Sequence, residues 1–389
     1  MSKRVIHLFT DEKFVDKFAK KYANSDFQNK FVFLGKAGKY KGGLDRLAEF
    51  IAIDSAEYND LPRRIEADYD ILIVYNLCSI KSYLISQISS DRLTIVWNFF
   101  GTEIYSLPGL RRKFLSGPTI KLLKGDINFR FKLLVKNILS ALRIRPSQHG
   151  LFLRAVKRVN HFAWYSIEEY NYLQSLINFK LPAYLHLSVN NILRDVRPEC
   201  NKSANILLGN SRSPFNNHLD MLQLLEKCQF NNQVTVPFNY GSGKNYAAAL
   251  KKRAGNMNVN VVFLEQFMAY PEYIKVINSH CAAIYNSHRQ LALGNIMICI
   301  VCGLKIYLST KNPLLAWLSN NDFRVYSIET DLENDLRSGN LSLMQSEIDL
   351  NLEAYEKLTT LNNNLKFLAT LDSIAGNKKG KKGLPERTT

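Results

Sequence analysis

The sequence predicts two α/β domains, each built around a parallel β-sheet. With 389 residues, the chain is too long for one ordinary hydrophobic core, and two domains are the simplest division. Its composition, 46% hydrophobic and 11% aromatic residues, is that of a folded protein. Short apolar runs alternate with amphipathic helical segments in both halves, which is typical of strands buried on both faces of a parallel sheet.

The first domain is expected over residues 1–185. Its first apolar run ends at Thr10-Asp11 and is followed by residues with helical spacing over 14–22. A linking region is expected to begin near Ala163 and to lead into the second domain. The strands expected in this half are 5–9, 31–34, 71–75 and 93–97.

The second domain is expected over residues 186–340. Gly294-Asn295 opens an apolar helix between the last two of its strands, which predicts a strand-helix-strand unit. A helical segment over 341–375 is expected to pack back towards the first domain, and residues 376–389 to form a flexible basic tail. The strands expected in this half are 205–208, 234–237, 260–263, 282–285 and 305–308.

A basic segment over residues 110–158 carries large apolar residues among its cations, and Asp126 is its single acid. Such a segment suits an in-plane contact with anionic lipid headgroups. The alternative is a solvated basic face folded against the first domain. The residues expected to contact the membrane are Arg111, Arg112, Lys113, Lys121, Lys124, Arg130, Lys132 and Lys136.

The formal charge of +17, from 51 Lys plus Arg against 34 Asp plus Glu, favours an anionic partner. Nucleic acid, anionic lipid and a phosphorylated substrate all qualify. A non-enzymatic nucleic-acid-binding protein is a remote alternative, because no DNA- or RNA-binding module signature is present and no nucleic-acid partner is expected.

The sequence favours a cytoplasmic protein that is peripheral to any membrane it contacts. The N-terminus does not resemble a signal peptide, and no uncharged apolar run has the length of a spanning helix. Six scattered cysteines lack the paired spacing of a secreted scaffold, so we expect them to be reduced. Cys299 and Cys302 form one CxxC in an apolar context, where buried packing is favoured over metal binding.

Two turns in the second half are candidates for binding a diphosphate. Both follow expected strands, and helix N-termini at such positions offer N–H groups and a positive dipole end to phosphates. Ordinary turn chemistry is the alternative. The absence of Gly-Lys-Ser/Thr and of GxGxxG argues against P-loop ATPases and dehydrogenases. The first turn contains Gly209, Asn210, Ser211 and Arg212, with His218 at the next helix, and the second contains His288, Arg289, Gln290, Gly294 and Asn295.

Glu103 and Asp11 are the candidate catalytic residues of the first half. Glu103 follows an apolar strand in an aromatic setting, where desolvation would raise its pKa and suit it to act as a general base on a sugar hydroxyl. Its alternative role is that of an acid in the first turn of a helix. Asp11 follows the first strand, and the same two roles, catalytic base or acid at a helix start, apply to it.

These stretches together resemble the TDP-N-acetylfucosamine:lipid II N-acetylfucosaminyltransferases, glycosyltransferase family 56. The resemblance covers roughly residues 1–330 in order. Glu103 replaces the aspartate that this family has at its position. The matching pieces are Ile6-His7 with Asp11, the block 97–105, Ile206 to Asn217-His218, Val236-Pro237 with Tyr240, Arg289-Gln290 with Gly294, and Asn312-Pro313.

The resemblance implies a GT-B fold, in which two Rossmann-like lobes face each other across a cleft. The donor nucleotide would bind the C-terminal lobe, with Pro237 and Tyr240 near it, and the acceptor the N-terminal lobe. No metal or other cofactor is implied, since positive side chains and helix dipoles would stabilise the departing diphosphate. The implied reaction moves a sugar such as N-acetylfucosamine from a nucleotide diphosphate to a polyprenyl-diphosphate-linked saccharide. The resemblance places this reaction in bacterial surface polysaccharide synthesis, at the cytoplasmic face of the inner membrane. A transferase of the same fold acting on O-antigen, capsule or protein with another donor is the alternative.

Overall fold

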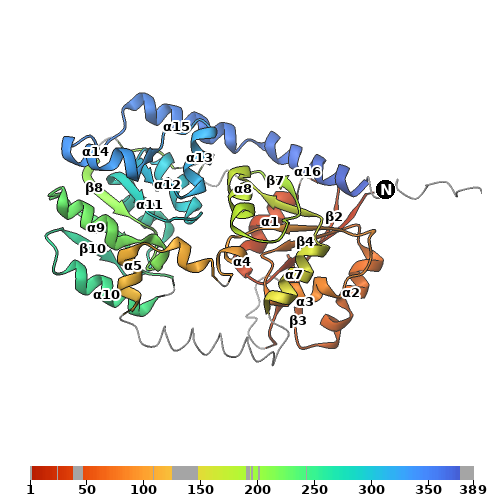
Figure 1. Cartoon of the computed structure of the whole chain (residues 1–389). Coiled ribbons are helices and arrows are strands. Elements are labelled where there is room, and N and C mark those ends of the chain that lie inside the picture. The colour runs from red at the N-terminus through yellow and green to blue at the C-terminus, as the bar shows by residue number, and fades with distance from the viewer. Residues whose placement is uncertain are drawn as a thin grey trace, which may run out of the picture. The chain divides into compact units, whose positions relative to one another are not determined.

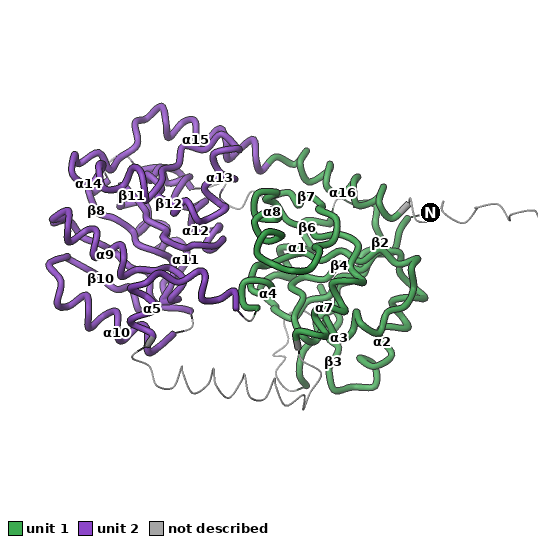
Figure 2. The backbone as a smooth tube through the Cα atoms, viewed as in Figure 1, with its two compact units in different colours: residues 1–107, 143–190, 360–389 green, residues 108–142, 191–359 purple. Residues whose placement is uncertain are grey.

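The computed structural model describes residues 2–23, 25–37, 47–107, 109–124, 148–189, 193, 196–199, 202–241 and 243–376. The chain divides into two compact units, which Figure 2 shows in different colours. Unit 1 comprises residues 1–107, 143–190 and 360–389, and unit 2 comprises residues 108–142 and 191–359. The chain therefore passes between the units more than once.

In unit 1, the described residues form a parallel sheet of seven strands in the order β3-β2-β1-β4-β5-β6-β7. The chain starts at β1, adds β2 and β3 on one side, and returns to place β4 on the other side of β1. The order therefore reverses between β1 and β4. The strands are β1 (Arg4–Phe9), β2 (Gln28–Gly35), β3 (Glu49–Ala52), β4 (Ile71–Tyr75), β5 (Thr94–Asn98), β6 (His161–Trp164) and β7 (Ala183–His186).

Helices cover both faces of this sheet. Side chains alternate between the two faces along each strand, so neighbouring residues contact different helices. Val96 belongs to an apolar cluster with residues of α1 and α16, whereas Trp97 on the opposite face contacts Phe152 of α7. Helix α3 packs beside α7. The helices of unit 1 are α1 (Val15–Tyr22), α2 (Ala56–Asp68), α3 (Ser79–Ser86), α4 (Thr102–Tyr105), α7 (Gln148–Arg158), α8 (Ile167–Leu176) and α16 (Leu361–Gly376), with a 3₁₀ turn η1 (Glu12–Phe14) (Figure 1).

Unit 2 repeats this architecture with six described strands in the order β10-β9-β8-β11-β12-β13, all parallel. The chain runs outward from β8 to β10 and returns to place β11 beside β8. The order therefore reverses between β8 and β11. The strands are β8 (Ser203–Leu208), β9 (Val234–Pro237), β10 (Val261–Leu264), β11 (His280–Tyr285), β12 (Lys305–Leu308) and β13 (Tyr326–Ser327).

One face of this second sheet packs against α5, α9, α10 and α14 through a single apolar cluster. Helix α12 contacts α11 and α15, and Tyr285 of β11 contacts Cys299 of α12. The helices of unit 2 are α5 (Gly117–Lys124), α9 (His218–Lys227), α10 (Lys244–Ala254), α11 (Tyr270–Asn278), α12 (Leu293–Val301), α13 (Pro313–Asn320), α14 (Glu333–Ser338) and α15 (Gln345–Leu358), with short turns η2 (Arg111–Phe114), η3 (Pro214–Asn216) and η4 (Ile328–Leu332).

The predicted fold class is confirmed, and the linking region expected from Ala163 is wrong. Strands β6 and β7 lie there, with α8 between them. Strand β6 contributes only three apolar residues after His161, and β7 is only partly buried and ends in a histidine, so each gives a weak apolar pattern. Cys299 and Cys302 are free and buried, as expected.

The unit boundaries also differ from those expected from the sequence. Residues 109–124 pack in unit 2, whereas α7, at the other end of the basic segment, packs in unit 1. The expected C-terminal helical segment is two helices, of which α15 belongs to unit 2 and α16 to unit 1. The tail expected over 376–389 lies outside the described residues beyond Gly376.

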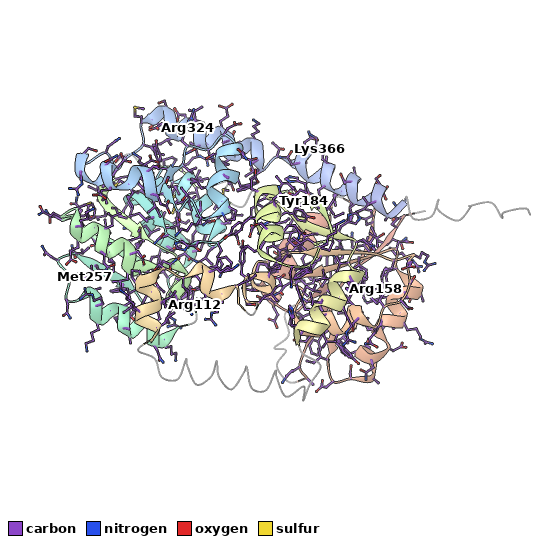
Figure 3. The ribbon with its side chains drawn as sticks, in the orientation of Figure 1. Arg112, Arg158, Tyr184, Met257, Arg324 and Lys366 are labelled. Carbon is purple, nitrogen blue, oxygen red and sulfur yellow. The ribbon has the colours of Figure 1, made fainter. Side chains whose placement is uncertain are left out.

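Three of the large apolar residues of the 109–124 segment face the protein interior. Leu110 and Phe114 are buried, and Leu123 belongs to the apolar cluster of unit 2, where α5 contacts α9 and α10. These three side chains are therefore part of the protein interior and form no exposed apolar surface. The cations Arg111, Arg112, Lys113 and Lys121 are exposed, and Arg112 is labelled in Figure 3. Lys124 ends α5, and Arg130, Lys132 and Lys136 lie outside the described residues.

Candidate active site

The reversal of strand order in unit 2 brings both predicted turns to one edge of the sheet. Strands β8 and β11 are adjacent and parallel, and Gly209 directly follows the first as Asn286 follows the second. Ligands of open α/β sheets bind outside the carboxyl ends of the strands at such a reversal. Both candidate turns therefore lie at the carboxyl edge of this sheet, after neighbouring strands.

Gly209 is required by both conformation and space. Its φ is +69°, a left-handed conformation that L side chains rarely adopt. A Cβ at this position would lie 2.8 Å from Nε2 of His218 and 3.1 Å from the Asn216 side chain. Its N–H donates to the carbonyl of Ile284, 2.9 Å away, and so ties the end of β8 to β11. This turn holds the His218 imidazole directly against the backbone.

His218 and Asn210 each present a buried polar atom that has no hydrogen-bond partner among the described residues: Nε2 of His218 and Oδ1 of Asn210. Nδ1 of His218 hydrogen-bonds the Tyr246 hydroxyl at 3.1 Å, and Nδ2 of Asn210 donates to the Tyr240 hydroxyl at 2.7 Å. Burial lowers the pKa of His218 to about 3, so its imidazole is neutral at physiological pH. Buried polar atoms normally have partners, and these two mark a place where a ligand could supply them.

Arg212 and Asn216 hold the loop in place. Nε of Arg212 donates to the carbonyl of Gly241 at 2.7 Å, and its backbone N–H donates to the carbonyl of Tyr240 at 3.0 Å. Nδ2 of Asn216 donates to the carbonyl of Ser211 at 2.9 Å. Arg212 thus holds the loop that follows Pro237 at the end of β9. The half-exposed Tyr240 belongs to this loop.

The second turn brings a nearly buried guanidinium to the same edge. Arg289 is 8% exposed, its Nη1 donates to the carbonyl of Gln290 at 3.0 Å, and its guanidinium carbon lies 4.6 Å from the ring centre of Phe215. Burial, with a smaller contribution from Lys311, lowers the pKa of His288 to about 4. The site therefore combines a permanent positive charge with neutral imidazoles, a combination suited to binding an anion.

Helix α12 begins just after this turn. Ala292 precedes it in a left-handed conformation with φ of 65°, and no side chain caps its first turn. Nδ2 of Asn295 donates to the Tyr273 hydroxyl at 3.1 Å, which points to a packing role for this amide. A Cβ on Gly294 would meet nothing within 4 Å, so the backbone leaves open space at the start of the helix.

Asn217 was not singled out as a site residue, yet it links the segments around the site. It is left-handed at φ 47° and precedes α9. Its Nδ2 donates to the carbonyls of Asn286 at 3.0 Å and of Phe114 at 3.2 Å, and its Oδ1 accepts from the N–H of Ser116 at 2.9 Å. The only sequence signal is the Asn-His pair at a helix start, which indicates a helix cap. It carries no information about hydrogen-bond partners that are distant in the sequence, such as Ser116 and Asn286.

Glu329 is a second residue that the sequence did not reveal. Its carboxylate accepts from Ser309 Oγ at 2.6 Å and from the N–H of Thr310 at 2.8 Å, just beyond the end of β12. These hydrogen bonds outweigh burial and hold its pKa below the ordinary value. Glu329 therefore remains a carboxylate. Its negative charge opposes the lowering of the His288 pKa.

In unit 1, Glu103 lies in the first turn of α4, beyond the end of β5. Its Oε1 accepts from Nε1 of Trp97 at 3.1 Å and from the N–H groups of Phe100 and Leu77, both at 3.2 Å. Its Oε2 is buried and has no partner among the described residues. Burial raises the pKa of this carboxyl despite those hydrogen bonds, as a general base near neutral pH requires.

Asp11 has a different environment from Glu103. It is exposed and forms an ion pair with Lys13 at 3.0 Å. Lys81, which the sequence did not suggest, is fully buried between the ends of β1 and β4, where its Nζ donates to Thr10 Oγ1 at 3.0 Å and to the carbonyl of Tyr75. Burial lowers the pKa of Lys81 to about 8, and Glu103 is among the groups that oppose this shift.

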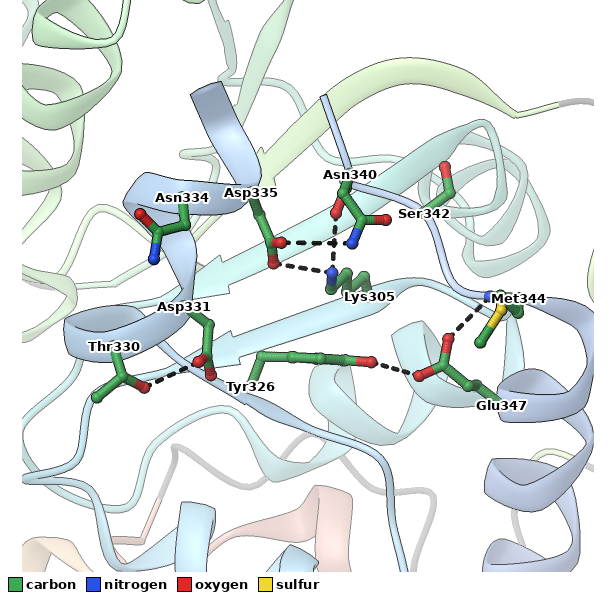
Figure 4. Close-up of a pocket in the computed structure, with 10 residues that line it drawn as sticks. All are labelled: Lys305, Tyr326, Thr330, Asp331, Asn334, Asp335, Asn340, Ser342, Met344 and Glu347. Atoms are coloured by element: carbon green, nitrogen blue, oxygen red, sulfur yellow. Dashed lines mark hydrogen bonds and ion pairs between the residues drawn. The ribbon is translucent and has the colours of Figure 1, made fainter. Parts of the chain in front are cut away.

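A separate pocket of unit 2 lies at the amino-terminal edge of the sheet, where β12 begins (Figure 4). Its Lys305 pairs with Asp335 at 2.8 Å and donates to the carbonyl of Asn340 at 2.8 Å, while the Tyr326 hydroxyl donates to Glu347 at 2.5 Å. These polar groups satisfy one another, so the pocket offers fewer open valences than the Gly209 and Arg289 turns.

A family model described as 4-alpha-L-fucosyltransferase glycosyl transferase group 56 matches residues 156–358, more than half of the chain. The chain belongs to this family. The matched span includes both turns at the β8–β11 reversal, and it leaves Glu103 outside. The predicted family is thereby confirmed, and with it the assignment as a glycosyltransferase.

Solved structures similar to this group 56 chain are glycosyltransferases of the GT-B fold. Anabaena HepE in complex with UDP has 10% identity and a TM-score of 0.60, covering 95% of this chain and 100% of that chain. Sucrose-phosphate synthase from Thermosynechococcus elongatus has 10% identity and a TM-score of 0.62, covering 96% and 100%. An alpha-glucosyltransferase in complex with UDP has 13% identity and a TM-score of 0.53, covering 96% and 100%. At these identities the similarity concerns the fold, and the predicted GT-B class is confirmed.

Two features are absent from the described part of the chain. No group of three or more His, Cys, Asp and Glu side chains in them is arranged to hold a metal ion. None of their helices combines the length and the apolar character needed to cross a bilayer.

Proposed function

We propose that this group 56 glycosyltransferase moves a deoxyamino sugar such as N-acetylfucosamine from a nucleoside diphosphate to a polyprenyl-diphosphate-linked saccharide. The observation that carries the donor half is the pair of turns at the β8–β11 reversal. They combine the buried Arg289 guanidinium with two polar atoms, on His218 and Asn210, that have no partner among the described residues. The family description, a fucosyltransferase, supports the type of sugar.

In the proposed reaction the acceptor hydroxyl oxygen attacks the anomeric carbon, and the bond from that carbon to the diphosphate oxygen breaks. The proton of the hydroxyl passes to Oε2 of Glu103, whose raised pKa suits it to accept a proton. The nucleoside diphosphate leaves with the negative charge, which Arg289 and the N–H groups at the start of α12 stabilise. No metal or other cofactor takes part in this proposal.

The acceptor side of the proposal is a lipid substrate at an anionic membrane surface, reached from the cytoplasmic face. Since Leu110, Phe114 and Leu123 are buried, the proposed contact in the described part of the basic segment is electrostatic, through Arg112, Lys113 and Lys121. Flotation with vesicles containing anionic lipid is expected at low salt and should weaken as salt rises. Binding to neutral vesicles of equal strength would contradict an electrostatic contact.

Transfer assays test the proposal directly. UDP-, TDP- and GDP-linked sugars are offered with a polyprenyl-diphosphate-linked saccharide and, separately, with water-soluble saccharide acceptors. The proposal predicts a glycosylated lipid product from a deoxyamino-sugar donor. A product formed only on a soluble saccharide or on protein would instead support a transferase of the same fold with another acceptor.

A further inference from the structure

Two arginines of unit 2, from distant parts of the sequence, lie against one aromatic ring. The guanidinium carbon of Arg289 is 4.6 Å from the ring centre of Phe215, and that of Arg111 is 5.6 Å from the same centre. Phe215 belongs to η3, between the Gly209 turn and α9. The ring therefore collects two permanent positive charges beside the turns proposed to bind the donor diphosphate.

The 109–124 segment is fixed at this place by specific hydrogen bonds. Asn217 accepts from the N–H of Ser116 and donates to the carbonyls of Phe114 and Asn286. Ser116 Oγ donates to Asp220 in the first turn of α9 at 2.5 Å. Phe114 ends the turn that carries Arg111 and is buried. The turn is therefore fixed to unit 2 by packing at this end.

We propose that Arg111 is a second phosphate-binding residue of the donor site and does not belong to the membrane-contacting surface. This inference rests on the proposed function. Guanidinium groups bind phosphates through paired N–H donors, and two of them beside one ring can share the oxygens of a diphosphate. Asn210 lies on the turn after β8 that precedes Phe215, and His218 begins the helix that follows Phe215; each has a buried polar atom with no partner among the described residues.

The test compares Arg111 with an exposed arginine of the same unit that has no proposed role. Dissociation constants for UDP, dTDP and inorganic pyrophosphate are measured by titration calorimetry for the wild type, Arg111→Ala and the exposed control Arg253→Ala. We expect Arg111→Ala to weaken binding of the tightest of these ligands by roughly tenfold or more, as for loss of a charge-assisted hydrogen bond. Arg253→Ala should stay within about twofold of the wild type. Arg111→Lys should restore part of the loss, since it keeps the charge without the fork.

Several results would overturn the inference. Each also shows whether the proposed function fails with it. If Arg289→Ala weakens binding and Arg111→Ala does not, the inference is wrong and the donor site stands. If Arg111→Ala lowers flotation with anionic vesicles and leaves nucleotide affinity unchanged, Arg111 belongs to a membrane contact. If the wild type binds none of the three ligands, the proposed function fails as well. Thermal unfolding of each variant shows whether it is folded.

Discussion

His7 in unit 1 and His218 in unit 2 are two buried histidines that differ in one respect. Burial lowers the pKa of each to about 3. Both nitrogens of His7 are occupied, Nδ1 by the Tyr75 hydroxyl at 3.0 Å and Nε2 by Asn29 Oδ1 at 2.9 Å. His218 has Tyr246 on one nitrogen and no partner on the other within the described residues.

The comparison shows that burial and a shifted pKa do not by themselves identify a functional side chain. His7 is a satisfied part of the unit 1 core, stacked 4.4 Å from Phe31. His218 lies at a reversal of strand order. Its ring packs so closely against residue 209 that only a glycine leaves room for it. An unfilled hydrogen-bonding valence at the carboxyl ends of the strands is the feature that distinguishes a candidate ligand site from packing.

The largest expected effect tests whether Glu103 in unit 1 is functional in the same sense as His218. Glu103→Gln keeps an acceptor for Trp97 but removes the base, so kcat should fall by roughly 10²–10⁴-fold. Donor affinity should not change. The control Asp11→Asn, at an exposed position, should alter kcat by a small factor. Transfer rates that survive Glu103→Gln would remove this residue from the mechanism.

Because burial raises the pKa of Glu103, the acidic limb of the wild-type rate profile should lie above the pH expected for an ordinary glutamate. The carboxyl must be deprotonated to accept a proton, so the rate should decline as pH falls through that raised value. A profile that is flat down to the ordinary glutamate range would contradict a general-base role.

Arg289→Ala should lower kcat/KM by about 10²–10³-fold, because it removes the buried cation proposed to stabilise the departing diphosphate. Arg253→Ala, an exposed arginine at the end of α10, is the matched control and should leave kcat/KM nearly unchanged. An equal effect of both substitutions would mean that Arg289 acts only through the general charge of the unit.

Replacing each histidine by glutamine separates packing from binding. His7→Gln leaves Tyr75 or Asn29 without a partner and should lower the free energy of unfolding by about 1–3 kcal/mol, with nucleotide affinity unchanged. His218→Gln should weaken nucleotide binding by roughly tenfold. Chemical denaturation and calorimetric titration measure the two effects. A reversed pattern would refute the distinction drawn between the two histidines.

The same two side chains make stability depend on pH. The unfolded chain takes up protons on histidine below its ordinary pKa of 6.5, whereas the folded protein does so only near pH 3. Stability should therefore fall as pH drops below 6.5, by about 1.4 kcal/mol per pH unit for each buried histidine. His218→Gln should reduce this slope, because it removes one of the two buried imidazoles. Denaturation midpoints between pH 7 and 5 test this expectation.

The smallest single effect is expected at Gly294, one of two glycines of the proposed donor site. Gly209→Ala should destabilise the protein by about 1–3 kcal/mol, since it strains a positive φ and collides with His218. Gly294→Ala lies in a helix with open space around it and should be neutral or stabilising by up to about 1 kcal/mol. Equal losses of stability at both positions would show that the His218 contact does not matter.

The sequence predicted both sheets because their central strands contain continuous apolar runs, as at Ile71–Tyr75 and at 282–285 in β11. It missed β6 and β7, whose short and partly polar runs do not show this pattern. It identified the Gly209 and Arg289 turns because turn residues followed strands. It did not identify Lys81, since a lysine within a helix is normally solvated and only tertiary packing buries this one.

The largest gap between the sequence and the structure concerns the 109–124 segment. Its alternating cations and apolar residues suggested a membrane surface, yet Leu123 is part of the unit 2 core and Arg111 lies over Phe215. Composition reports which residues are present and carries no information on which distant segment they contact. The hydrogen bonds of Asn217 to this segment could be found only in three dimensions.

A crystal structure with the tightest-binding nucleoside diphosphate tests the central claim most directly. We expect the diphosphate at the ends of β8 and β11, in contact with Arg289 and with a phosphate or ribose oxygen near Nε2 of His218. Density for the diphosphate in the Lys305 pocket of Figure 4, or elsewhere away from the Gly209 turn, would contradict the account.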